Sequence, residues 1–587
     1  MENPHAHYSA RLNYWNSTVS SLARLESLST RARLFTGGLI LVTGWLAFGS
    51  RVLHPAFFLV AFAALVPLVI LHESAVRRRQ SALRARALFE AALARLGGEW
   101  AGRGTAGTQF RSPRHVYSED LDVFGHGSLF ELLCTARTAA GQAALASWLC
   151  EPASREQALA RQLAVRELIP RAALRENLAL LGQQIETRIH PHFLRQWGEA
   201  PAVAFPAYLR WFAPLLATAG AVTFMLWLFS QLPLSAFLLV ILITGTLTLV
   251  NSGRIERVVD ALDTPARELE LISKSLAALE RETFHSSLLT ERAPHASQAI
   301  AQLETLVDRL NWAHNLGFAP AAFVLLWKLQ HAAAIERWRV RHGRQIAGWL
   351  DSLATFEALN SLANYAFEHP TATFPDLSPD TPHWAANGLA HPLLPESRAV
   401  ANDIELDPQR RLFIVSGSNM SGKSTLLRAV GLNTILAWSG APVRASHLRL
   451  SAFSLGAAIR TVDSLIEGHS RFFAEITRLR QIVDLTQQSL PVLFLLDELL
   501  SGTNSHDRRL GAEGILRSLM DRGAYGLVTT HDLALTEIAA QLPGAANIHL
   551  EDTFEHGQIR FDYKLRPGVV HRSNALELMR SVGLPVH

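Results

Sequence analysis

The feature that most constrains the fold is the stretch GSNMSGKST, Gly417–Thr425, which has the spacing G-x-x-x-x-G-K-[ST]. The apolar run LFIVS, Leu412–Ser416, leads directly into it, and the helical pattern LLRAVGLNTILAW follows it. A strand, a glycine-containing loop and a helix in this order point backbone N–H groups and the positive end of a helix at an anion. The sequence therefore predicts an α/β domain whose loop binds nucleotide phosphates, with Lys423 at the β- and γ-phosphates and the Ser424 hydroxyl on Mg²⁺.

A second motif supplies acidic groups. VLFLLDE, Val492–Glu498, is an apolar run that ends in two carboxylates, as expected for a buried strand that ends at a nucleotide site. We interpret Asp497 as holding Mg²⁺ through water and Glu498 as polarising the attacking water. An ordinary core strand with a solvated acidic end is the alternative. AYGLVTTHD places His531 at the end of another strand, where it senses the γ-phosphate or, alternatively, has a structural role.

Four apolar runs form two pairs with short connectors. The first pair is Leu34–Gly49 and Ala56–Leu71, joined by SRVLHP, and the second is Trp211–Phe229 and Pro233–Val250, joined by SQL. A membrane-spanning helix needs about 17–25 residues, so each run is long enough when its flanking residues are included. The runs predict two transmembrane hairpins, and two buried core hairpins are the alternative.

The charges and cysteines bear on topology and compartment. The connectors carry only Arg51, whereas the arginines that flank the outer ends of the two pairs are Arg24, Arg31, Arg33, Arg77, Arg78, Arg79, Arg210, Arg254 and Arg257. This bias predicts outer ends in the cytoplasm and connectors that face outward. Cys134 and Cys150 form no CxxC pair, which fits a reducing compartment. We therefore expect a multi-pass protein of the bacterial inner (cytoplasmic) membrane, with its nucleotide domain in the cytoplasm.

Two further segments concern the helical part of the chain. Leu269, Ile272, Leu276 and Leu279 recur at heptad-like spacing, which predicts a long amphipathic helix and leaves ordinary helix packing and a coiled coil both open. The apolar run Leu316–Trp327 is shorter than the four others, and we predict a core or interfacial helix there. The formal charge of +4, from 55 basic and 51 acidic residues, permits nucleic acid or an anionic membrane as a partner but requires neither.

Taken together, the motifs resemble the MutS family. The resemblance rests on the Asn-Met pair in the phosphate loop, on EGHSRFFAEITRL at Glu467–Leu479, on DELLSGTNSHD at Asp497–Asp507 and on FDYKLRPGV at Phe561–Val569. Upstream, Ser128–Pro152 is similar to the start of the family's core helical domain, and Trp349–Ala366 is similar to its return helix. These segments keep the family's order along the chain.

The resemblance implies a fold of class α plus α/β. With the two hairpins predicted from the apolar runs, the expected fold comprises membrane helical hairpins, a MutS-like helical core and lever domain, and a C-terminal P-loop ABC-type ATPase domain. The expected ranges are 1–86 for the N-terminal region with the first hairpin, 87–205 for the first part of the core, 206–255 for the second hairpin, 256–380 for the lever and second part of the core, and 381–587 for the ATPase domain.

The resemblance also implies ligands and partners. ATP with Mg²⁺ is expected, hydrolysed to ADP and phosphate. Family ATPases act as dimers with composite sites, so we expect a homodimer in which Ser470 reaches the nucleotide of the other subunit. Within one subunit the residues expected to contact ATP are Gly417, Ser418, Asn419, Met420, Ser421, Gly422, Lys423, Ser424 and Thr425.

The chain departs from the family at several points. Ser418 and Ser421 stand where the family has Pro and Gly, Leu500–Ser501 replaces a Gly-Arg pair, and Ala399 replaces an aromatic residue. No mismatch-reading domain with a Phe-x-Glu wedge precedes the core, and the second hairpin falls where a DNA-gripping clamp would be inserted. We therefore expect a membrane-anchored ATPase, related to mismatch repair proteins, that binds duplex DNA through its phosphates without true mismatch recognition. One alternative is an ATP-driven membrane scaffold that recruits proteins. An ABC-type transporter is less favoured, because no LSGGQ-like sequence precedes VLFLLDE.

Overall fold

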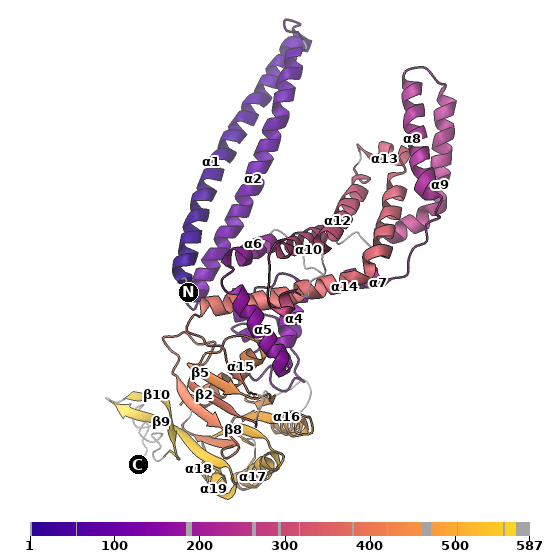
Figure 1. Ribbon diagram of the computed structural model, residues 1–587. Helices are drawn as coiled ribbons and strands as arrows, with labels where there is room; N and C mark the ends of the chain where they lie inside the picture. The colour runs from indigo at the N-terminus through magenta and orange to yellow at the C-terminus, as the bar shows by residue number, and fades with distance from the viewer. Residues whose placement is uncertain are drawn as a thin grey trace. The chain divides into compact units, whose positions relative to one another are not determined.

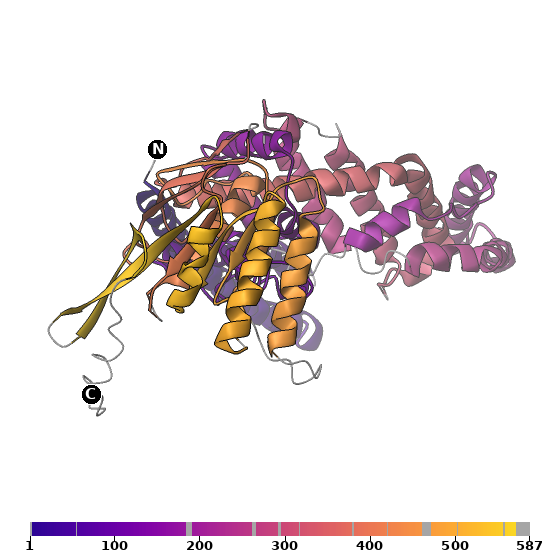
Figure 2. The same cartoon turned by 90° about the horizontal axis from the view of Figure 1, so that it is seen from below.

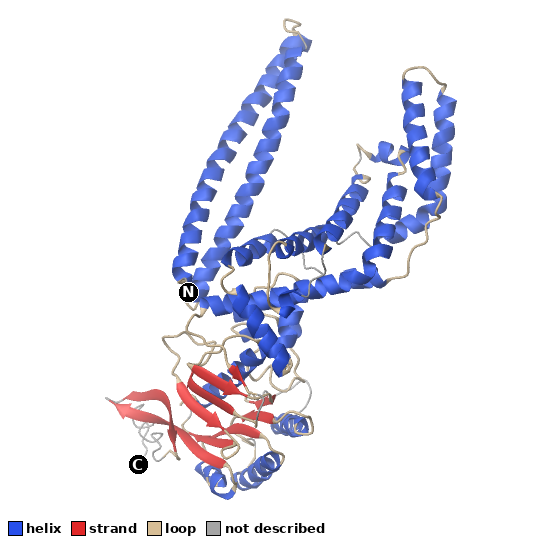
Figure 3. Cartoon of the chain, viewed as in Figure 1, coloured by secondary structure: helices blue, strands red, loops and turns tan. Residues whose placement is uncertain are grey.

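The computed structural model describes residues 3–54, 56–183, 191–260, 266–290, 295–315, 317–378, 381–418, 421–460, 471–501, 503–555 and 558–570. The chain divides into two compact units, Met1–Gly104 and Thr105–His587. The first unit is helical, and the second contains further helices and all of the strands that the structure describes (Figures 1 and 3). Each unit is treated by itself below.

The first unit is an antiparallel helical hairpin. Helix α1 (Pro4–Gly44) begins at Asn3, whose side chain accepts hydrogen bonds from the N–H groups of His5 and Ala6, and it continues into one π-helical turn, η1 (Trp45–Gly49). Helix α2 (Ala56–Leu96) returns along it. The buried residues of its second half recur at intervals of seven and three or four, as in a coiled-coil seam: Ala75, Ala82, Ala85, Phe89 and Ala92. The four alanines allow α1 to approach closely, and Phe89 packs on Tyr8 of α1.

The apolar halves of this hairpin are exposed. The side chains of Leu34, Phe35 and Leu41 in α1 and of Leu59 and Val60 in α2 are each more than 60% accessible. Among the described residues, four helices are long and apolar enough to span a membrane: Pro4–Gly49, Ala56–Leu96, Leu209–Leu228 and Leu234–Asp260. These helices contain the four apolar runs predicted from the sequence except for Phe229 and Pro233, which lie between α8 and α9.

The second unit begins with a helical region built around one long helix, α14 (Trp327–Glu368). The other helices of this region are α3 (Leu129–Leu133), α4 (Ala139–Cys150), α5 (Arg155–Leu168), α6 (Ala172–Gln183), α7 (Pro191–Glu199), α8 (Leu209–Leu228), α9 (Leu234–Asp260), α10 (Ala266–Glu280), α11 (Ser287–Thr290), α12 (Ala296–Trp312) and α13 (Ala319–Val324); a 3₁₀ turn, η2 (Thr108–Phe110), precedes them. Helices α4, α5, α7, α9 and α12 all contact α14, so this helix is the spine of the region (Figure 1).

The heptad-like leucines and the shorter apolar run are both placed by the structure. Leu269, Ile272, Leu276 and Leu279 lie on α10 and are buried. Because α10 packs mainly on α12 of the same chain, with further contacts to α6 and α14, ordinary helix packing accounts for their spacing. The shorter apolar run contains α13, which packs against α8, α9 and α14 while its Phe323 stays exposed.

The C-terminal part is an α/β domain with two sheets. The larger sheet has the strand order β10-β9-β4-β8-β7-β6, in which only β9 and β10 pair antiparallel. Its strands are β4 (Leu412–Ser416), β6 (Ser454–Ala458), β7 (Val492–Leu496), β8 (Tyr525–Thr530), β9 (Ala545–Glu555) and β10 (Gln558–Pro567). The smaller sheet has the order β1-β5-β2-β3, formed by β1 (Asp376–Leu377), β2 (Trp384–Leu389), β3 (Asn402–Leu406) and β5 (His447–Leu450).

Helices cover both faces of the larger sheet. On one face, Phe494 of β7 and Val528 of β8 join a core with residues of α16 (Arg471–Leu485), α17 (Ser505–Asp521), α18 (Leu533–Thr536) and α19 (Ile538–Gln541). Figure 2 shows these helices side by side against the strands. Leu495 points to the opposite face, where it lies against Gly431 of α15 (Lys423–Ser439). Adjacent strand residues alternate between faces, so β7, being buried on both sides, is apolar throughout.

Candidate nucleotide-binding site

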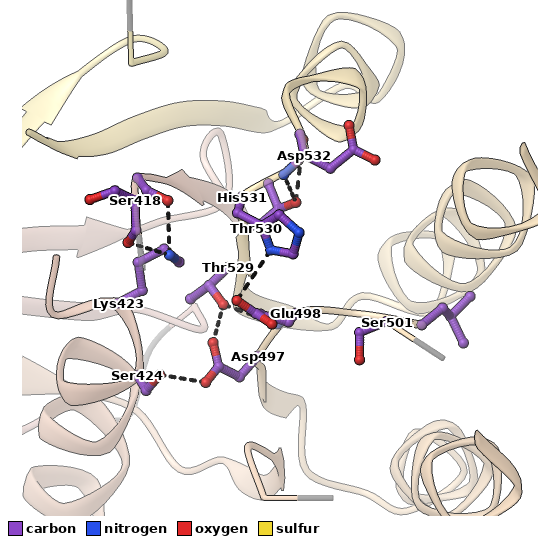
Figure 4. A network of polar contacts seen from close by, with 12 residues as sticks. Ser418, Lys423, Ser424, Asp497, Glu498, Ser501, Thr529, Thr530, His531 and Asp532 are labelled. Carbon is purple, nitrogen blue, oxygen red and sulfur yellow. Dashed lines mark hydrogen bonds and ion pairs between the residues drawn. The ribbon is translucent and has the colours of Figure 1, made fainter. Parts of the chain in front are cut away.

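The predicted functional residues come together at one edge of the larger sheet. Strands β4, β8 and β7 are neighbours and run parallel, so their carboxyl ends meet at the same edge. The glycine loop follows β4, His531 follows β8, and Asp497 and Glu498 follow β7. Figure 4 shows these side chains directed toward one another.

Lys423 lies at the start of α15, and its ammonium group lies inside the loop. Its Nζ donates hydrogen bonds to the carbonyl oxygens of Gly417 at 2.8 Å and Ser418 at 2.7 Å. Burial lowers the pKa of Lys423, while the nearby carboxylates of Glu498 and Asp497 act in the opposite direction. A cation held by carbonyl oxygens beside a helix N-terminus is placed to meet an anionic ligand.

Two serines of the loop add unsatisfied polar groups. The Oγ atoms of Ser418 and Ser421 are buried and have no hydrogen-bond partner among the residues that the structure describes. Buried hydroxyls are normally hydrogen-bonded, so these atoms suit a ligand that accepts hydrogen bonds, as a phosphate does. These two hydroxyls therefore support a phosphate-binding loop, although Ser418 and Ser421 depart from the family pattern.

The pair formed by Ser424 and Asp497 suits a magnesium ion. Ser424 Oγ donates to Asp497 Oδ2 at 2.5 Å, and Thr529 Oγ1 donates to Asp497 Oδ1. Mg²⁺ is bound through one or two protein groups together with substrate phosphates and water. In the described part of the chain no cluster of three or more His, Cys, Asp or Glu residues could hold a metal by itself. A hydroxyl and a carboxylate beside a phosphate loop fit an ion that is brought in with the nucleotide.

Glu498 and His531 form the second polar pair. His531 Nδ1 lies 3.2 Å from Glu498 Oε1. The backbone of Glu498 has the left-handed φ of 49°, and its N–H donates to Thr529 Oγ1 at 3.1 Å. A non-glycine residue in this region is strained and must be held by its surroundings. Here the strained backbone and the histidine together direct the carboxylate toward the loop.

The turn after Glu498 is held from two sides. The buried carboxylate of Glu475 on α16 accepts the N–H of Leu500 at 2.6 Å. Arg508 on α17 donates to the carbonyl oxygens of Leu500 and Ser501, each at 3.1 Å. Leu500–Ser501, which replaces the family's Gly-Arg pair, therefore lies in a turn whose backbone is hydrogen-bonded to both neighbouring helices.

A pocket of about 860 Å³ lies beside the loop. Its lining runs from Ser421–Thr425 at one end to His391, Val400 and Tyr563. Pockets for drug-sized ligands and cofactors occupy about 300–1,000 Å³, and this one has a volume in that range. Ala399, which stands where the family has an aromatic residue, does not line this pocket.

The sequence predicted no role for Tyr563, although the segment Phe561–Val569 around it resembles the MutS family. Tyr563 lies at an irregularity of β10 with φ of 55°. Asn402 on β3 holds this backbone, since its Nδ2 donates to Tyr563 O at 2.9 Å and its Oδ1 accepts from Leu565 N at 2.8 Å. Gly422 has φ of +97°, and a Cβ there would lie 2.9 Å from Tyr563 Cδ1. The ring thus lies against the loop because residue 422 is glycine.

A second feature missed by sequence reasoning is residues 113–123, here called the edge strap. The carbonyl of Val116 accepts the N–H of Ala457 on the edge strand β6 at 2.9 Å. Asp120 Oδ1 accepts the N–H groups of Ile459 at 2.7 Å and Arg460 at 2.8 Å. Burial raises the pKa of Asp120, although the two N–H groups oppose this. The family-like segments begin after the strap, so no motif indicated it.

The edge strap also reaches the helices that flank the site. Arg428 on α15 donates to the Asp120 carbonyl at 3.2 Å, and Arg478 on α16 donates to the His115 carbonyl at 2.6 Å. The edge strap is therefore hydrogen-bonded both to α15, the helix that follows the phosphate loop, and to α16. Of the predicted site residues, Asn419, Met420 and Ser470 lie outside the residues that the structure describes.

The fold and the site together define a mixed helical and α/β protein with a candidate nucleotide site at the carboxyl ends of its parallel strands. Comparison with known proteins identifies the domain: residues 413–587 match the MutS domain V family. The chain therefore carries a domain of the MutS family at residues 413–587.

Two relatives give the extent of the likeness. The chain is 39% identical over 181 residues to the DNA mismatch repair protein MutS 2 of Haloarcula marismortui, which covers 30% of this chain and 19% of that protein. It is 30% identical over 238 residues to the DNA mismatch repair protein MutS of Streptococcus pyogenes serotype M49, which covers 40% of this chain and 28% of that protein. The matched region thus spans less than a third of the length of either relative.

Proposed function

We propose that this chain is a membrane-anchored ATPase of the MutS type, which hydrolyses Mg²⁺-bound ATP and acts on duplex DNA near the membrane. The observation that carries the ATPase part is the convergence of Lys423, the Ser424–Asp497 pair and the Glu498–His531 pair at one sheet edge. A cation, a metal-binding pair and an acid–histidine pair are the groups that phosphoryl transfer to water requires.

Each group has a distinct task in this proposal. The loop amides, Lys423 and the hydroxyls of Ser418 and Ser421 bind the phosphates. Ser424 and Asp497 hold Mg²⁺, which when bound neutralises charge on the phosphate oxygens. Glu498 accepts a proton from the attacking water, and His531, 3.2 Å away, keeps its carboxylate in position.

The pocket supports a nucleoside on the same loop. Tyr563 packs beside Gly422, and Leu389, His391 and Val400 supply further walls. Burial, reinforced by the positive charges of Arg428 and Arg444, lowers the pKa of His391 to about 4, so this ring is neutral at physiological pH. The apolar side chains of Leu389, Leu394 and Val400 suit the base, and the polar groups of Arg398 and Asn402 in the same lining can donate hydrogen bonds to it.

The family likeness supports the dimer in this proposal, and the apolar helices support the membrane anchoring. In a homodimer with composite sites, Ser470 of one subunit would reach the nucleotide of the other. Four long apolar helices, with arginines at their outer ends, support anchoring in the inner membrane with the α/β domain in the cytoplasm. Both relatives are named as DNA mismatch repair proteins, which supports DNA as the partner.

The test is ATP hydrolysis by the detergent-solubilised full chain, with and without duplex DNA. We expect slow, Mg²⁺-dependent turnover and DNA binding that falls by about 10³–10⁵ between roughly 50 and 200 mM salt, if some six to ten phosphates are contacted. A mismatched duplex should bind within about threefold of a paired one, because phosphate contacts carry no sequence information. Clear mismatch preference would contradict the proposed mode of binding, and no binding at low salt would favour the protein-recruiting scaffold.

A further inference from the structure

Helix α13 packs against the middle of the second apolar hairpin, α8–α9. A Cβ on Gly220 of α8 would lie 2.9 Å from Val324 Cγ1, and one on Gly245 of α9 would lie 3.6 Å from Phe323 Cζ. The residues Ala221–Leu228 that remain before the end of α8 extend about 12 Å at roughly 1.5 Å per residue. On α9, the residues Leu234–Thr244 that precede Gly245 extend about 17 Å by the same rise. The hairpin therefore projects past α13 by about half of the bilayer's hydrocarbon core, which is about 30 Å thick.

Charged side chains lie at the level of α13. Helix α12 ends shortly before it and α14 begins shortly after it, and Trp327 Nε1 donates to the carbonyl of Arg309 at 2.5 Å, which joins the two helix ends. Asp308, Arg309 and Lys328 are all exposed. If the hairpin crossed the bilayer upright, these charges would lie near the middle of the hydrocarbon, where ionised side chains are strongly disfavoured.

The lipid-facing surface of the hairpin lies on its other side. On α8, the buried residues Leu209, Ala213, Leu216 and Gly220 form one stripe. The side chains of Trp211, at 74% exposure, and Leu215, at 67%, lie on the opposite stripe. An oblique hairpin places the exposed stripe against lipid and keeps the charged ends of α12 and α14 in water. An upright hairpin also places the stripe against lipid, but it carries these charged ends into the hydrocarbon.

We propose that the second hairpin enters a single leaflet obliquely, that its tip at Ser230 stays within the membrane, and that α13 lies at the lipid–water interface and limits the depth of insertion. The partner of α13 is thus the bilayer surface. Exposed Trp312, stacked on Trp327, and exposed Phe323 provide the aromatic contacts typical of that surface. The inference rests on the proposed membrane anchoring and differs from the outward-facing SQL connector predicted from the charges alone.

Cysteine labelling of the full chain tests this depth. In a variant with Cys134→Ser and Cys150→Ser, single cysteines replace Ser50 at the first tip, Ser230 at the second tip and the exposed Ser489 of the α/β domain. An impermeant maleimide is applied to intact cells and again after permeabilisation. We expect Ser50→Cys to be labelled in intact cells, Ser489→Cys only after permeabilisation, and Ser230→Cys poorly in both conditions.

Depth-dependent quenching provides the second measurement. A fluorophore on Ser230→Cys, in vesicles containing nitroxide lipids, should be quenched most by nitroxides deep in the acyl chain. A fluorophore on Phe323→Cys should be quenched most by nitroxides near the headgroup. Replacing the charges by Asp308→Leu, Arg309→Leu and Lys328→Leu together should deepen the insertion and make Ser230→Cys reactive in intact cells.

The outcomes separate this inference from the proposed function. If Ser230→Cys reacts in intact cells as fully as Ser50→Cys, the hairpin crosses the bilayer and the inference is overturned. If it reacts after permeabilisation as fully as Ser489→Cys, the hairpin lies in water and the inference is again overturned. Unchanged labelling in the charge-free variant would overturn the part of the inference that limits insertion depth at α13 and the charged helix ends beside it. Extraction of the parent chain by alkaline carbonate, with Ser50→Cys unlabelled in intact cells, would instead remove the membrane part of the proposed function.

Discussion

The α/β domain and the first helical hairpin place their apolar side chains in opposite ways. In β4, β7 and β8 every residue is buried, and apolar contacts on both faces of the sheet surround the strands. In the hairpin, Leu41 is 76% exposed and Leu34 is 73% exposed, although both lie on a regular helix. Equally apolar stretches therefore end up covered by protein in one region and uncovered in the other.

The difference indicates which solvent each region meets. A strand needs neighbouring strands and helices to satisfy its backbone and bury its side chains, whereas a helix satisfies its own backbone and can face lipid directly. The nucleotide site uses the covered region, because its charges must be held at fixed distances by a packed core. If this division is correct, changes in one region should leave the activity of the other intact.

The largest effect is expected for Glu498→Gln. The amide cannot accept the proton of the attacking water, so turnover should fall by about 10²–10⁴, while ATP binding is retained. Membrane association should match the parent. Phosphate release and nucleotide titration measure the two quantities. Glu513→Gln, at a half-buried acid on α17 that pairs with Arg517, is the matched control. Turnover at the parent rate would contradict the role given to Glu498.

The reverse experiment is Leu41→Arg in the hairpin. A charge near the centre of the apolar run should cost about 2.5–3.5 kcal/mol of insertion free energy, or roughly 50–300-fold in the insertion equilibrium. Carbonate extraction measures the shift, and nucleotide affinity should be unchanged. Ser27→Arg, at an exposed position outside the apolar run, is the control. If Leu41→Arg and Ser27→Arg were retained equally in the membrane, the conclusion that the apolar half of the hairpin faces lipid would be contradicted.

Lys423→Ala should weaken ATP binding by about 10–100-fold, because a charge-assisted hydrogen bond contributes roughly 1.5–3 kcal/mol. A fluorescent ATP analogue titrated into detergent-solubilised protein gives the affinity. Lys274→Ala removes a surface lysine that pairs with Glu270 and should leave the affinity unchanged. An unaltered affinity in Lys423→Ala would place the nucleotide elsewhere than the loop.

Tyr563→Ala should reduce ATP affinity by a smaller factor, about 3–15-fold, because an aromatic contact contributes roughly 0.5–1.5 kcal/mol. Tyr563→Phe keeps the ring and should bind like the parent. The same nucleotide titration checks both variants. If Tyr563→Phe bound ATP as weakly as Tyr563→Ala, the hydroxyl of Tyr563 and not its ring would be the group that contacts the nucleotide.

The smallest effect concerns pH. The pKa of His391 is lowered to about 4, mainly by burial, so between pH 4 and 6.5 the unfolded chain binds more protons than the folded one. Stability is then fully present above about pH 6.5 and is lost as the pH falls toward 4, by about 1 kcal/mol at pH 5.5. Thermal unfolding of the solubilised protein should show this slope. The slope should decrease in His391→Asn and stay unchanged in His506→Asn, an exposed control. Part of it should remain, because burial also lowers the pKa values of His115, His331 and His369.

Local sequence determined much of this protein. A spacing of six residues between Gly417 and Lys423, preceded by LFIVS, was sufficient to predict a strand, a loop and a helix, because that geometry is local to a few turns of chain. The acidic pair after VLFLL and the histidine after AYGLVTT were predicted in the same way. The four long apolar helices also follow from composition alone, since no other regular structure satisfies its backbone without neighbours.

Tertiary structure decided what lies between these segments. Tyr563 lies 140 residues from Lys423 along the chain, and it reaches the loop only through a strand irregularity held by Asn402. Asp120 meets the backbone of Ile459 because a strap without regular structure crosses the sheet edge. The two apolar hairpins read alike as sequences, yet α13 and α14 pack along the second one. Such contacts join residues far apart in the chain, so they depend on how the packed elements fit together and leave no periodicity in the sequence.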